Sequence, residues 1–308
     1  MNEERTKSPP SKIMMFKNII RSYRLRQWVK SGFILAPALF TLHFLEPKTW
    51  AHLILSVLGF SLVSSAVYIF NDLTNRDEDR LHPTKKTRPI ASGNLQTLPA
   101  FFGLILALIV GMILLVVASG KGAIIGGSYF LLMVLYSIWL RRVPIVDIII
   151  VAVGFVMRVI LGSIIINEPL SHWMLLCTFT IALYLGLVKR RQEIAAMDQS
   201  DNSGRKVLVS YPLLSVIDSW ITVLTAMTLI FYALYTVDPR TVEKHHTSAL
   251  IYTLPLVLYG IFRYQKLAVN DRAGEDPAAL VVRDGGIKIT VVLWVVAVAS
   301  ILTLARKV

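Results

Sequence analysis

The chain has 308 residues, of which 55% are hydrophobic and only 17% are charged, and its formal net charge is +13. A soluble domain carries about a quarter charged residues, so this composition excludes an ordinary soluble fold and indicates an integral membrane protein. The positive charge comes with no soluble basic module or aromatic stacking platform, so we expect no nucleic-acid partner.

The chain begins with a polar, basic segment that lacks the pattern of a cleavable signal peptide. We predict a disordered tail over residues 1–14 and a single transmembrane domain over residues 15–308. The segment that follows the tail mixes Arg24, Arg26 and Lys30 with Trp28. Such a segment is typical of an anchor at the lipid headgroups, and it would equally suit a ligand-binding role.

Apolar runs long enough to cross a bilayer recur along the rest of the chain. They predict an all-α membrane fold with nine transmembrane helices, at about 32–46, 52–71, 99–118, 122–140, 145–166, 171–188, 213–236, 247–263 and 288–305. The first run is short and needs an extension back into residues 26–30. Cys177, the single cysteine, lies inside the sixth run, which excludes disulfides and cysteine-metal sites.

The placement of basic residues fits this count of spans. With the N-terminus in the cytoplasm, 25 of the 32 Lys and Arg residues fall in cytoplasmic segments, six fall on the opposite side, and Arg158 lies within a span. Such enrichment is the positive-inside rule. We therefore predict that the charged clusters at 72–88, 189–206 and 263–288 face one cytoplasmic cavity.

Residues 71–83, at the end of the second run, pack several acids and bases together. Asp72, Asn75 and Asp79 are spaced i, i+3 and i+7, which places them on one face of a helix. Carboxylate and amide oxygens are ligands of Mg²⁺, which usually shares its shell with substrate phosphates. The motif therefore predicts a Mg²⁺–diphosphate site. The alternative is an ordinary solvated helix end with intrahelical ion pairs.

The next segment contains two prolines, Pro83 and Pro89, that prevent a continuous helix. We expect an ordered loop over the acidic helix, from which Lys85 and Arg88 project toward phosphate oxygens. A plain interhelical loop would also use Pro and Gly.

Two further groups of charges lie on later spans. Arg158 sits in the middle of the fifth run, and an intramembrane arginine marks a functional site unless it pairs structurally, here with Asp147. The sixth run ends in Lys189-Arg190-Arg191-Gln192-Glu193, whose Lys189 and Glu193 could form a helix pair. This cluster would meet the acidic motif if the two halves of the bundle face each other, or it could only anchor the topology.

The motif Asn71-Asp72 with Asp79, followed by Arg88-Pro89-Ile90-Ala91-Ser92-Gly93, resembles the UbiA superfamily of intramembrane prenyltransferases. Within it, the sequence is most similar to the branch of decaprenyl-phosphate phosphoribosyltransferases. The segments that carry this similarity are Arg26-Gln27-Trp28-Val29-Lys30, His82-Pro83-Thr84-Lys85, Arg158 with Gly162, Ser171-His172-Trp173, Lys189-Arg190 with Glu193, and Glu275-Asp276-Pro277 through Arg283-Asp284.

The resemblance implies a UbiA-type fold with a cytoplasm-facing polar cavity in a bacterial or archaeal cytoplasmic membrane. It implies an enzyme that transfers 5-phosphoribosyl from phosphoribosyl diphosphate to a polyprenyl (decaprenyl) phosphate, releases diphosphate, and serves cell-envelope arabinose donor synthesis. The metal would be Mg²⁺ on Asp72, Asn75 and Asp79. The implied catalytic residues are Asp72, Asp79, Lys189 and Arg190, and the implied substrate-binding residues are Lys30, Asn71, Arg76, His82, Lys85, Arg88, Arg158 and Glu193. A homo-oligomer is compatible with the sequence.

The sequence departs from the family pattern at Asn75, where an Asp is usual, so the number of metal ions stays open. Leu25 and Ser31 also replace a usual Pro and Asn. The main alternative is a prenyltransferase that moves a polyprenyl group from its diphosphate to an aromatic or other small acceptor. A transporter or channel is disfavoured because only Arg158 lies deep in a span.

Overall fold

The computed structural model of the chain describes residues 12–41, 43–82, 84–195, 210–270, 280–281 and 283–306, and every regular element in them is helical. Seven of these helices are long and apolar enough to cross a bilayer. They are α3 (Pro47–Thr74), α5 (Thr97–Ala118), α6 (Gly120–Ile138), α7 (Val146–Ile166), α8 (His172–Ala195), α10 (Leu214–Val237) and α14 (Gly285–Ala305).

Two of the nine predicted spans are shorter or interrupted. The first predicted span falls on η1 (Leu25–Leu35), a 3₁₀ helix of 11 residues, and on α2 (Ala36–Thr41). A 3₁₀ helix of this length is uncommon, and Pro37 lacks the N–H that would continue a regular α-helical ladder. The eighth falls on η5 (Ala249–Thr253) and α12 (Leu254–Asn270), of which α12 has 17 residues.

The other elements are short connections. They are α1 (Lys12–Ser22), η2 (His43–Leu45), α4 (Arg76–Leu81), η3 (Lys85–Thr87), η4 (Leu140–Arg142) and α11 (Pro239–His245). Helix α1 therefore begins inside the range that the sequence predicted as a tail. The predicted motif Glu275-Asp276-Pro277 lies outside the described residues.

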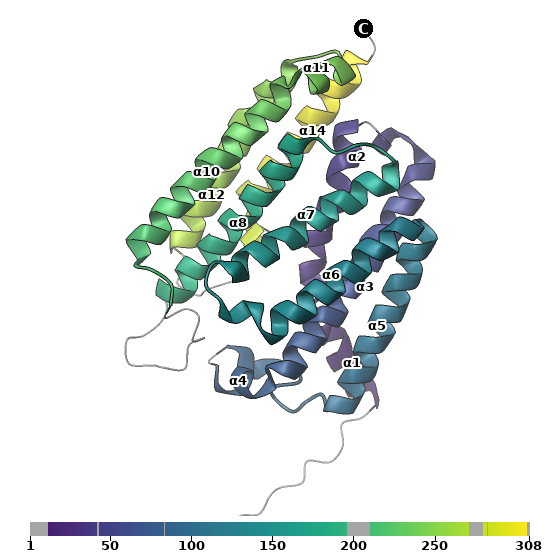
Figure 1. The fold of residues 1–308 in the computed structure, drawn as a ribbon, viewed down its shortest axis with the longest axis vertical. Coiled ribbons are helices and arrows are strands. Elements are labelled where there is room, and N and C mark those ends of the chain that lie inside the picture. The colour runs from purple at the N-terminus through teal and green to yellow at the C-terminus, as the bar shows by residue number, and fades with distance from the viewer. Residues whose placement is uncertain are drawn as a thin grey trace, which may run out of the picture.

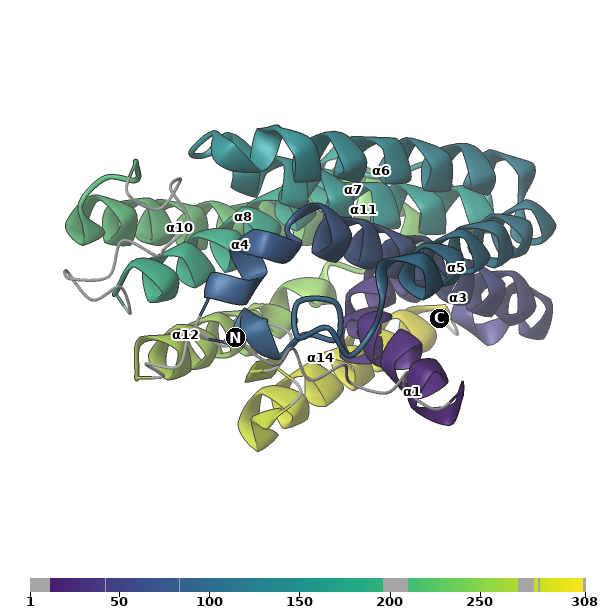
Figure 2. The ribbon, with the colours of Figure 1, turned by 90° about the horizontal axis from the view of Figure 1, so that it is seen from below.

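The long helices run side by side along the bundle (Figure 1). Helix α4 lies at one end, and α11 lies at the other together with the C-terminal end of α14 (Figure 1). We call these the α4 end and the α11 end. Seen from below, α3, α5, α6 and α7 gather on one side, while α12 and α14 lie on another (Figure 2).

Close backbone approach holds α3 against α5. A Cβ atom on Gly59 would lie 2.9 Å from the carbonyl oxygen of Gly111, and one on Gly111 would lie 2.8 Å from that of Gly59. Gly162 on α7 is in similar contact with the backbone of Ile34 in η1. Small residues at such crossings favour helix association in membranes, where packing rather than the hydrophobic effect holds helices together.

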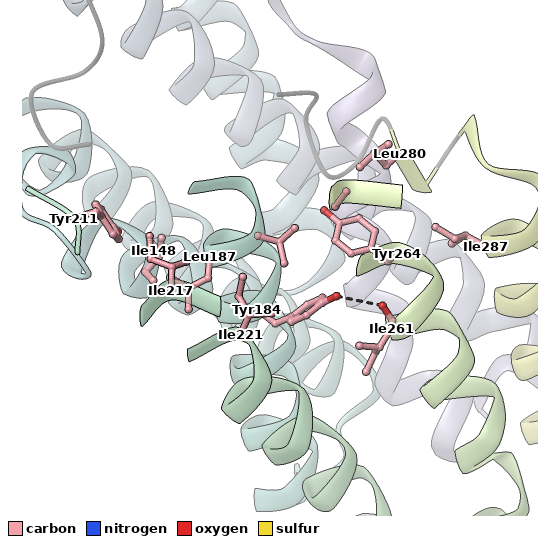
Figure 3. Packing of buried hydrophobic residues seen from close by; sticks show 12 residues of the cluster. Ile148, Tyr184, Leu187, Tyr211, Ile217, Ile221, Ile261, Tyr264, Leu280 and Ile287 are labelled. Atoms are coloured by element: carbon pink, nitrogen blue, oxygen red, sulfur yellow. Dashed lines mark hydrogen bonds between the residues drawn. The ribbon is translucent and has the colours of Figure 1, made fainter. Parts of the chain in front are cut away.

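A second packing region joins α8, α10 and α12. Tyr184 and Leu187 of α8 contact Ile217 and Ile221 of α10 in a buried cluster that includes Ile261 of α12 (Figure 3). The Tyr184 hydroxyl donates a hydrogen bond of 3.2 Å to the Ile261 carbonyl oxygen. The apolar side chains of this cluster pack α8 against α10 and α12.

Candidate active site

A cavity of about 330 Å³ lies between η1, α3, α6, α7 and α8 and reaches η3 at the α4 end. Its inner wall is largely apolar and aromatic, and includes Phe33, Val67, Tyr129, Met133 and Phe155. Its charged lining consists of seven cationic side chains, Arg24, Lys30, Lys85, Arg88, Arg158, Lys189 and Arg190, and two acidic ones, Asp147 and Glu193. The cavity thus combines room for an apolar chain with a strongly cationic lining.

The acidic pair of the first motif lies directly behind this lining. Asp72 occupies the last turn of α3 and Asp79 lies in α4, with 2% and 6% of each residue exposed. Both accept hydrogen bonds from Arg88 Nη1, at 3.0 Å from Asp72 Oδ1 and 2.6 Å from Asp79 Oδ2. Asp72 also pairs with Arg24. The alternative interpretation of the motif, a solvated helix end with intrahelical ion pairs, is therefore wrong for Asp72 and Asp79.

Burial and the neighbouring charges act on these groups in opposite directions. Burial raises the pKa of Asp79, and the positive charge of Arg88 offsets part of that rise. Burial, and then the positive charge of Arg24, lowers the pKa of Arg88. The order Arg24, Asp72, Arg88 and Asp79 alternates in sign, so each carboxylate has a cationic partner.

The donor set of this motif suits a hard divalent cation. The carboxylates of Asp72 and Asp79 both contact the Arg88 guanidinium. A metal ion bound between these carboxylates would therefore replace one positive group with another. Asn75 Nδ2 donates to Asn71 O (2.7 Å) and Oδ1 (2.9 Å), which brings two amide groups next to the acids. Among the described residues no group of three His, Cys, Asp or Glu side chains is placed to hold a metal ion by itself. Phosphate oxygens or water would complete the shell, as is usual for Mg²⁺.

The second charged cluster lines the opposite wall of the same cavity. Arg190, 5% exposed, is held between Asp147 of α7 and Glu193 of its own helix. Asp147 accepts from Arg190 Nε at 2.8 Å and from the Tyr211 hydroxyl at 2.5 Å. From the sequence, Asp147 was a candidate structural partner of Arg158. This pairing is wrong, because Arg190 and Tyr211 engage both carboxylate oxygens of Asp147.

Arg158 lies deeper, among aromatic rings. Its guanidinium carbon is 4.7 Å from the centre of the Phe60 ring and 5.0 Å from that of Tyr129. Its nitrogens donate to Gly154 O (2.6 Å) and to the hydroxyls of Ser64 and Tyr129 (3.2 Å each). The described residues give Arg158 no carboxylate partner, and its buried Nε has no hydrogen-bond partner there. A cation held only by neutral groups attracts an anionic ligand.

The predicted site residues fall into two groups. Those that line the cavity are Lys30, Asn71, Lys85, Arg88, Arg158, Lys189, Arg190 and Glu193. Those that do not are Asp72, Asn75, Arg76, Asp79 and His82. His82 Nδ1 accepts from the backbone N–H groups of Thr84 and Lys85 at 3.3 and 3.4 Å, so His82 shapes the turn that presents Lys85.

Sequence reasoning missed the roles of three residues. The sequence indicated Arg24 only as part of an interfacial segment. In the structure Arg24 forms an ion pair with Asp72, and its guanidinium carbon lies 5.0 Å from the centre of the Tyr68 ring. No sequence motif indicated that Asp147 and Tyr211 contact each other or Arg190. The one available indication was an acidic residue in the first turn of a transmembrane helix, which is itself unusual.

Comparison with known proteins places these features in context. The model of the UbiA prenyltransferase family matches residues 33–289. The decaprenyl-phosphate phosphoribosyltransferase of Mycolicibacterium smegmatis is 28% identical over 96% of this chain and 95% of its own length, and that of Mycobacterium tuberculosis is 27% identical over 97% and 98%. The solved structure of a UbiA homolog from Archaeoglobus fulgidus bound to DMAPP and Mg²⁺ superposes with a TM-score of 0.69 at 17% identity, covering 93% of this chain and 99% of that one.

Proposed function

The chain belongs to the UbiA prenyltransferase family, and within this family of membrane transferases we propose that it transfers 5-phosphoribosyl from phosphoribosyl diphosphate to a polyprenyl phosphate. The family that the sequence resembled is thus confirmed, and the substrates form the proposal. The similarity to two decaprenyl-phosphate phosphoribosyltransferases along nearly their full length supports it.

One observation carries the proposal: the excess of positive charge in the cavity. Among the described residues, seven cationic side chains line it against four acids, two in the lining and Asp72 and Asp79 behind it. Arg158 is the buried member of this set that has no carboxylate partner among the described residues. A buried charge is costly without an opposite charge, so the ligands should supply negative charge beside Arg158 as well as at the α4 end. Phosphoribosyl diphosphate and a lipid phosphate together do so, whereas a prenyl diphosphate with an uncharged aromatic acceptor supplies only one anionic group.

The residues of the acidic motif would hold the leaving group. Asp72 and Asp79, with an amide oxygen of Asn71 or Asn75, would bind Mg²⁺, which neutralises charge on the departing diphosphate. Arg88 and Lys85 lie beside this point and would bind diphosphate oxygens through charge-assisted hydrogen bonds. Lys189 and Arg190, which line the same cavity, would also bind phosphate oxygens of the donor, those of the diphosphate included.

The bond from the ribosyl C1 to the diphosphate oxygen breaks, and a bond from C1 to an oxygen of the lipid phosphate forms. The acceptor is already ionised near neutral pH, so no general base is required. Catalysis would rest on orienting two anionic partners and on electrostatic stabilisation of the charge that develops. Arg158 or Lys30 would meet the lipid phosphate, with the aromatic and aliphatic inner wall beside the first part of its chain.

We propose a nine-span topology in which η1 with α2 and η5 with α12 complete the seven long helices. The α4 end would face the cytoplasm, in agreement with the location of most basic residues and with entry of a water-soluble donor. The protein would then reside in a bacterial or archaeal cytoplasmic membrane.

The test is incubation of the purified protein with radiolabelled phosphoribosyl diphosphate, polyprenyl phosphate and Mg²⁺, followed by lipid extraction. Label in the lipid fraction is expected, and it should depend on both substrates. Absence of labelled lipid, with no binding of phosphoribosyl diphosphate in a titration with Mg²⁺, would contradict the proposal. Transfer from a polyprenyl diphosphate to an aromatic acceptor would then be the reaction to assay.

A further inference from the structure

Asp147 is the centre of a buried network on the wall that carries Arg190. It lies in the first turn of α7 and is 0% exposed. Its Oδ2 atom lies 2.8 Å from both Nε and Nη2 of Arg190, while its Oδ1 atom accepts from the Tyr211 hydroxyl at 2.5 Å. Both carboxylate oxygens are therefore used within the protein, and Asp147 itself has little capacity left for a ligand.

Tyr211 also binds the segment that precedes α7. Its hydroxyl oxygen accepts a hydrogen bond of 3.1 Å from the Ile145 backbone N–H. Ile145 has φ of 70°, a conformation that is strained for a β-branched residue and persists only where the surroundings hold it. The Tyr211 ring lies beside Ile148 and Ile217 in the buried cluster (Figure 3). One hydroxyl thus fixes both the entry into α7 and the orientation of Asp147.

The protonation of Tyr211 suits this role. Burial, and then its hydrogen bond to Asp147, raises the pKa of Tyr211 above its ordinary value. The hydroxyl therefore remains a donor throughout the neutral range. Asp147 in turn engages two nitrogens of the Arg190 guanidinium, and Glu193 engages the third. A guanidinium has more N–H donors than these contacts use, so Arg190 keeps donors for a ligand in the cavity that it lines.

We propose that Asp147 and Tyr211 are positioning residues that hold the Arg190 guanidinium in the orientation in which it binds a phosphate group. The inference rests on the proposed role of Arg190 in binding phosphate, but not on the identity of the sugar or the acceptor. Without the Tyr211 hydroxyl, Asp147 would lose one of its two anchors and Ile145 its hydrogen-bond acceptor. The guanidinium would then be less well oriented while its charge stayed in place.

The experiment measures binding of inorganic diphosphate, in the presence of Mg²⁺, to the full chain in lipid nanodiscs by calorimetry. Tyr211→Phe should weaken binding by about three- to tenfold, which is the fold-change expected if one hydrogen bond from Arg190 to diphosphate is lost. The matched control is Tyr184→Phe, which removes a buried hydroxyl that donates to Ile261 O, outside the network. This control should bind diphosphate as the wild type does.

A double-mutant cycle separates positioning from a general loss of structure. In an Arg190→Gln background, Tyr211→Phe should have almost no further effect, because it acts through Arg190. Asp147→Asn, which keeps the shape and removes the charge, should weaken binding more than Tyr211→Phe and should also be non-additive with Arg190→Gln. If Tyr211→Phe does not fold, Asp147→Asn takes its place in the cycle.

An equal effect of Tyr211→Phe in both backgrounds, or equal losses in Tyr211→Phe and Tyr184→Phe, would overturn the inference. So would unchanged diphosphate affinity in both Tyr211→Phe and Asp147→Asn. Diphosphate is released in both of the reactions considered for this protein. Failure to use phosphoribosyl diphosphate, with the cycle intact, would therefore contradict the proposed function alone.

Discussion

Arg88 and Asp79 are joined by a hydrogen bond of 2.6 Å between Nη1 and Oδ2, and the same nitrogen lies 3.0 Å from Asp72 Oδ1. One guanidinium from the loop after α4 therefore bridges an acid of α3 and an acid of α4. Because both carboxylates are nearly inaccessible, their partners matter for folding as well as for ligand binding. The predictions for this motif follow from that double role.

Asp72→Ala and Asp79→Ala should abolish turnover. From the sequence alone these changes would cost little stability, but each removes a carboxylate partner from a partly buried arginine, so we expect a loss on the order of 1–3 kcal/mol. Activity and thermal unfolding of each variant in nanodiscs check this. Thr74→Ala, at an exposed position at the end of α3, is the control for both variants. Turnover above about a tenth of the wild-type value would argue against metal ligation by these acids.

Asn75→Asp should make stability depend on Mg²⁺. The sequence suggests that it is tolerated, because it restores the family's usual acid. In the structure Asn75 Nδ2 donates to two oxygens of Asn71, and a carboxylate there would face those oxygens without a proton to share. The variant should unfold at a lower temperature than the wild type in EDTA and recover in millimolar Mg²⁺. Equal unfolding temperatures in the two conditions would contradict a metal site at this position.

Lys189→Ala should raise the KM for phosphoribosyl diphosphate far more than that for the lipid. Loss of one charge-assisted contact corresponds to about a ten- to hundredfold weaker interaction. Steady-state kinetics with each substrate varied in turn measure the two constants. Lys266→Ala, outside the cavity lining, should change neither. A larger effect on the lipid KM would place Lys189 at the acceptor instead.

The stability of the protein should fall as the pH drops from about 6.5 to about 4 because of His245, at the α11 end. Burial, and then the positive charge of Lys244, lowers the pKa of His245 from 6.5 to about 4. In this window the unfolded chain binds a proton that the folded chain does not bind, so the contribution is full above pH 6.5 and is lost below it. Thermal unfolding at pH 5 and pH 7.5 should show a smaller difference for His245→Asn than for the wild type.

His43 provides a control of opposite sign for that experiment. Burial lowers the pKa of His43, but hydrogen bonds to Glu46 and Glu168 outweigh it and the net shift is upward. Its contribution is present at low pH and is lost as the pH rises. His43→Gln should therefore steepen the loss of stability on acidification. A shallower loss in His43→Gln would contradict the assignment of these opposing roles.

The proposed orientation predicts opposite accessibility of the two ends of the bundle. In a Cys177→Ser background, Thr87→Cys at the α4 end should react only with a reagent applied from the cytoplasmic side. Glu243→Cys, at an exposed position of α11, should react from the outer side. Labelling of both cysteines from the same side would refute the topology.

The sequence was sufficient to predict the all-helical class, the family and most of the long helices, because long apolar runs leave the chain few alternatives in a bilayer. It was less reliable at η1 and α2, where it predicted one regular span. Hydropathy shows that residues 32–46 are apolar, but it does not set the length of the helix that they form. That length also depends on Pro37 and on contacts with Gly162 of α7, which is distant in the sequence.

The site was predictable where the motif was local and not where it depended on packing. The spacing of Asp72, Asn75 and Asp79 predicted one face of a single helix, and this is wrong because the helix breaks at Asn75, so that Asp72 lies in α3 and Asp79 in α4. The spacing also could not reveal that Arg24 and Arg88 cover the acids. The pairing of Arg190 with Asp147 spans 43 positions and depends on how α7 meets α8. Tyr211 completes that network from a third segment, and local spacing carries no trace of such an arrangement.

The cationic lining of the cavity also has a kinetic consequence. A recess with an excess of positive charge and low-dielectric walls concentrates field lines, so it raises the rate at which an anionic donor reaches the site. Added salt screens that field, with a Debye length of about 10 Å at 0.1 M and about 3 Å at 1 M. The association rate of phosphoribosyl diphosphate should therefore drop with ionic strength more steeply than its dissociation rate rises. The lining would steer the anionic substrate electrostatically toward the cavity before any direct contact forms.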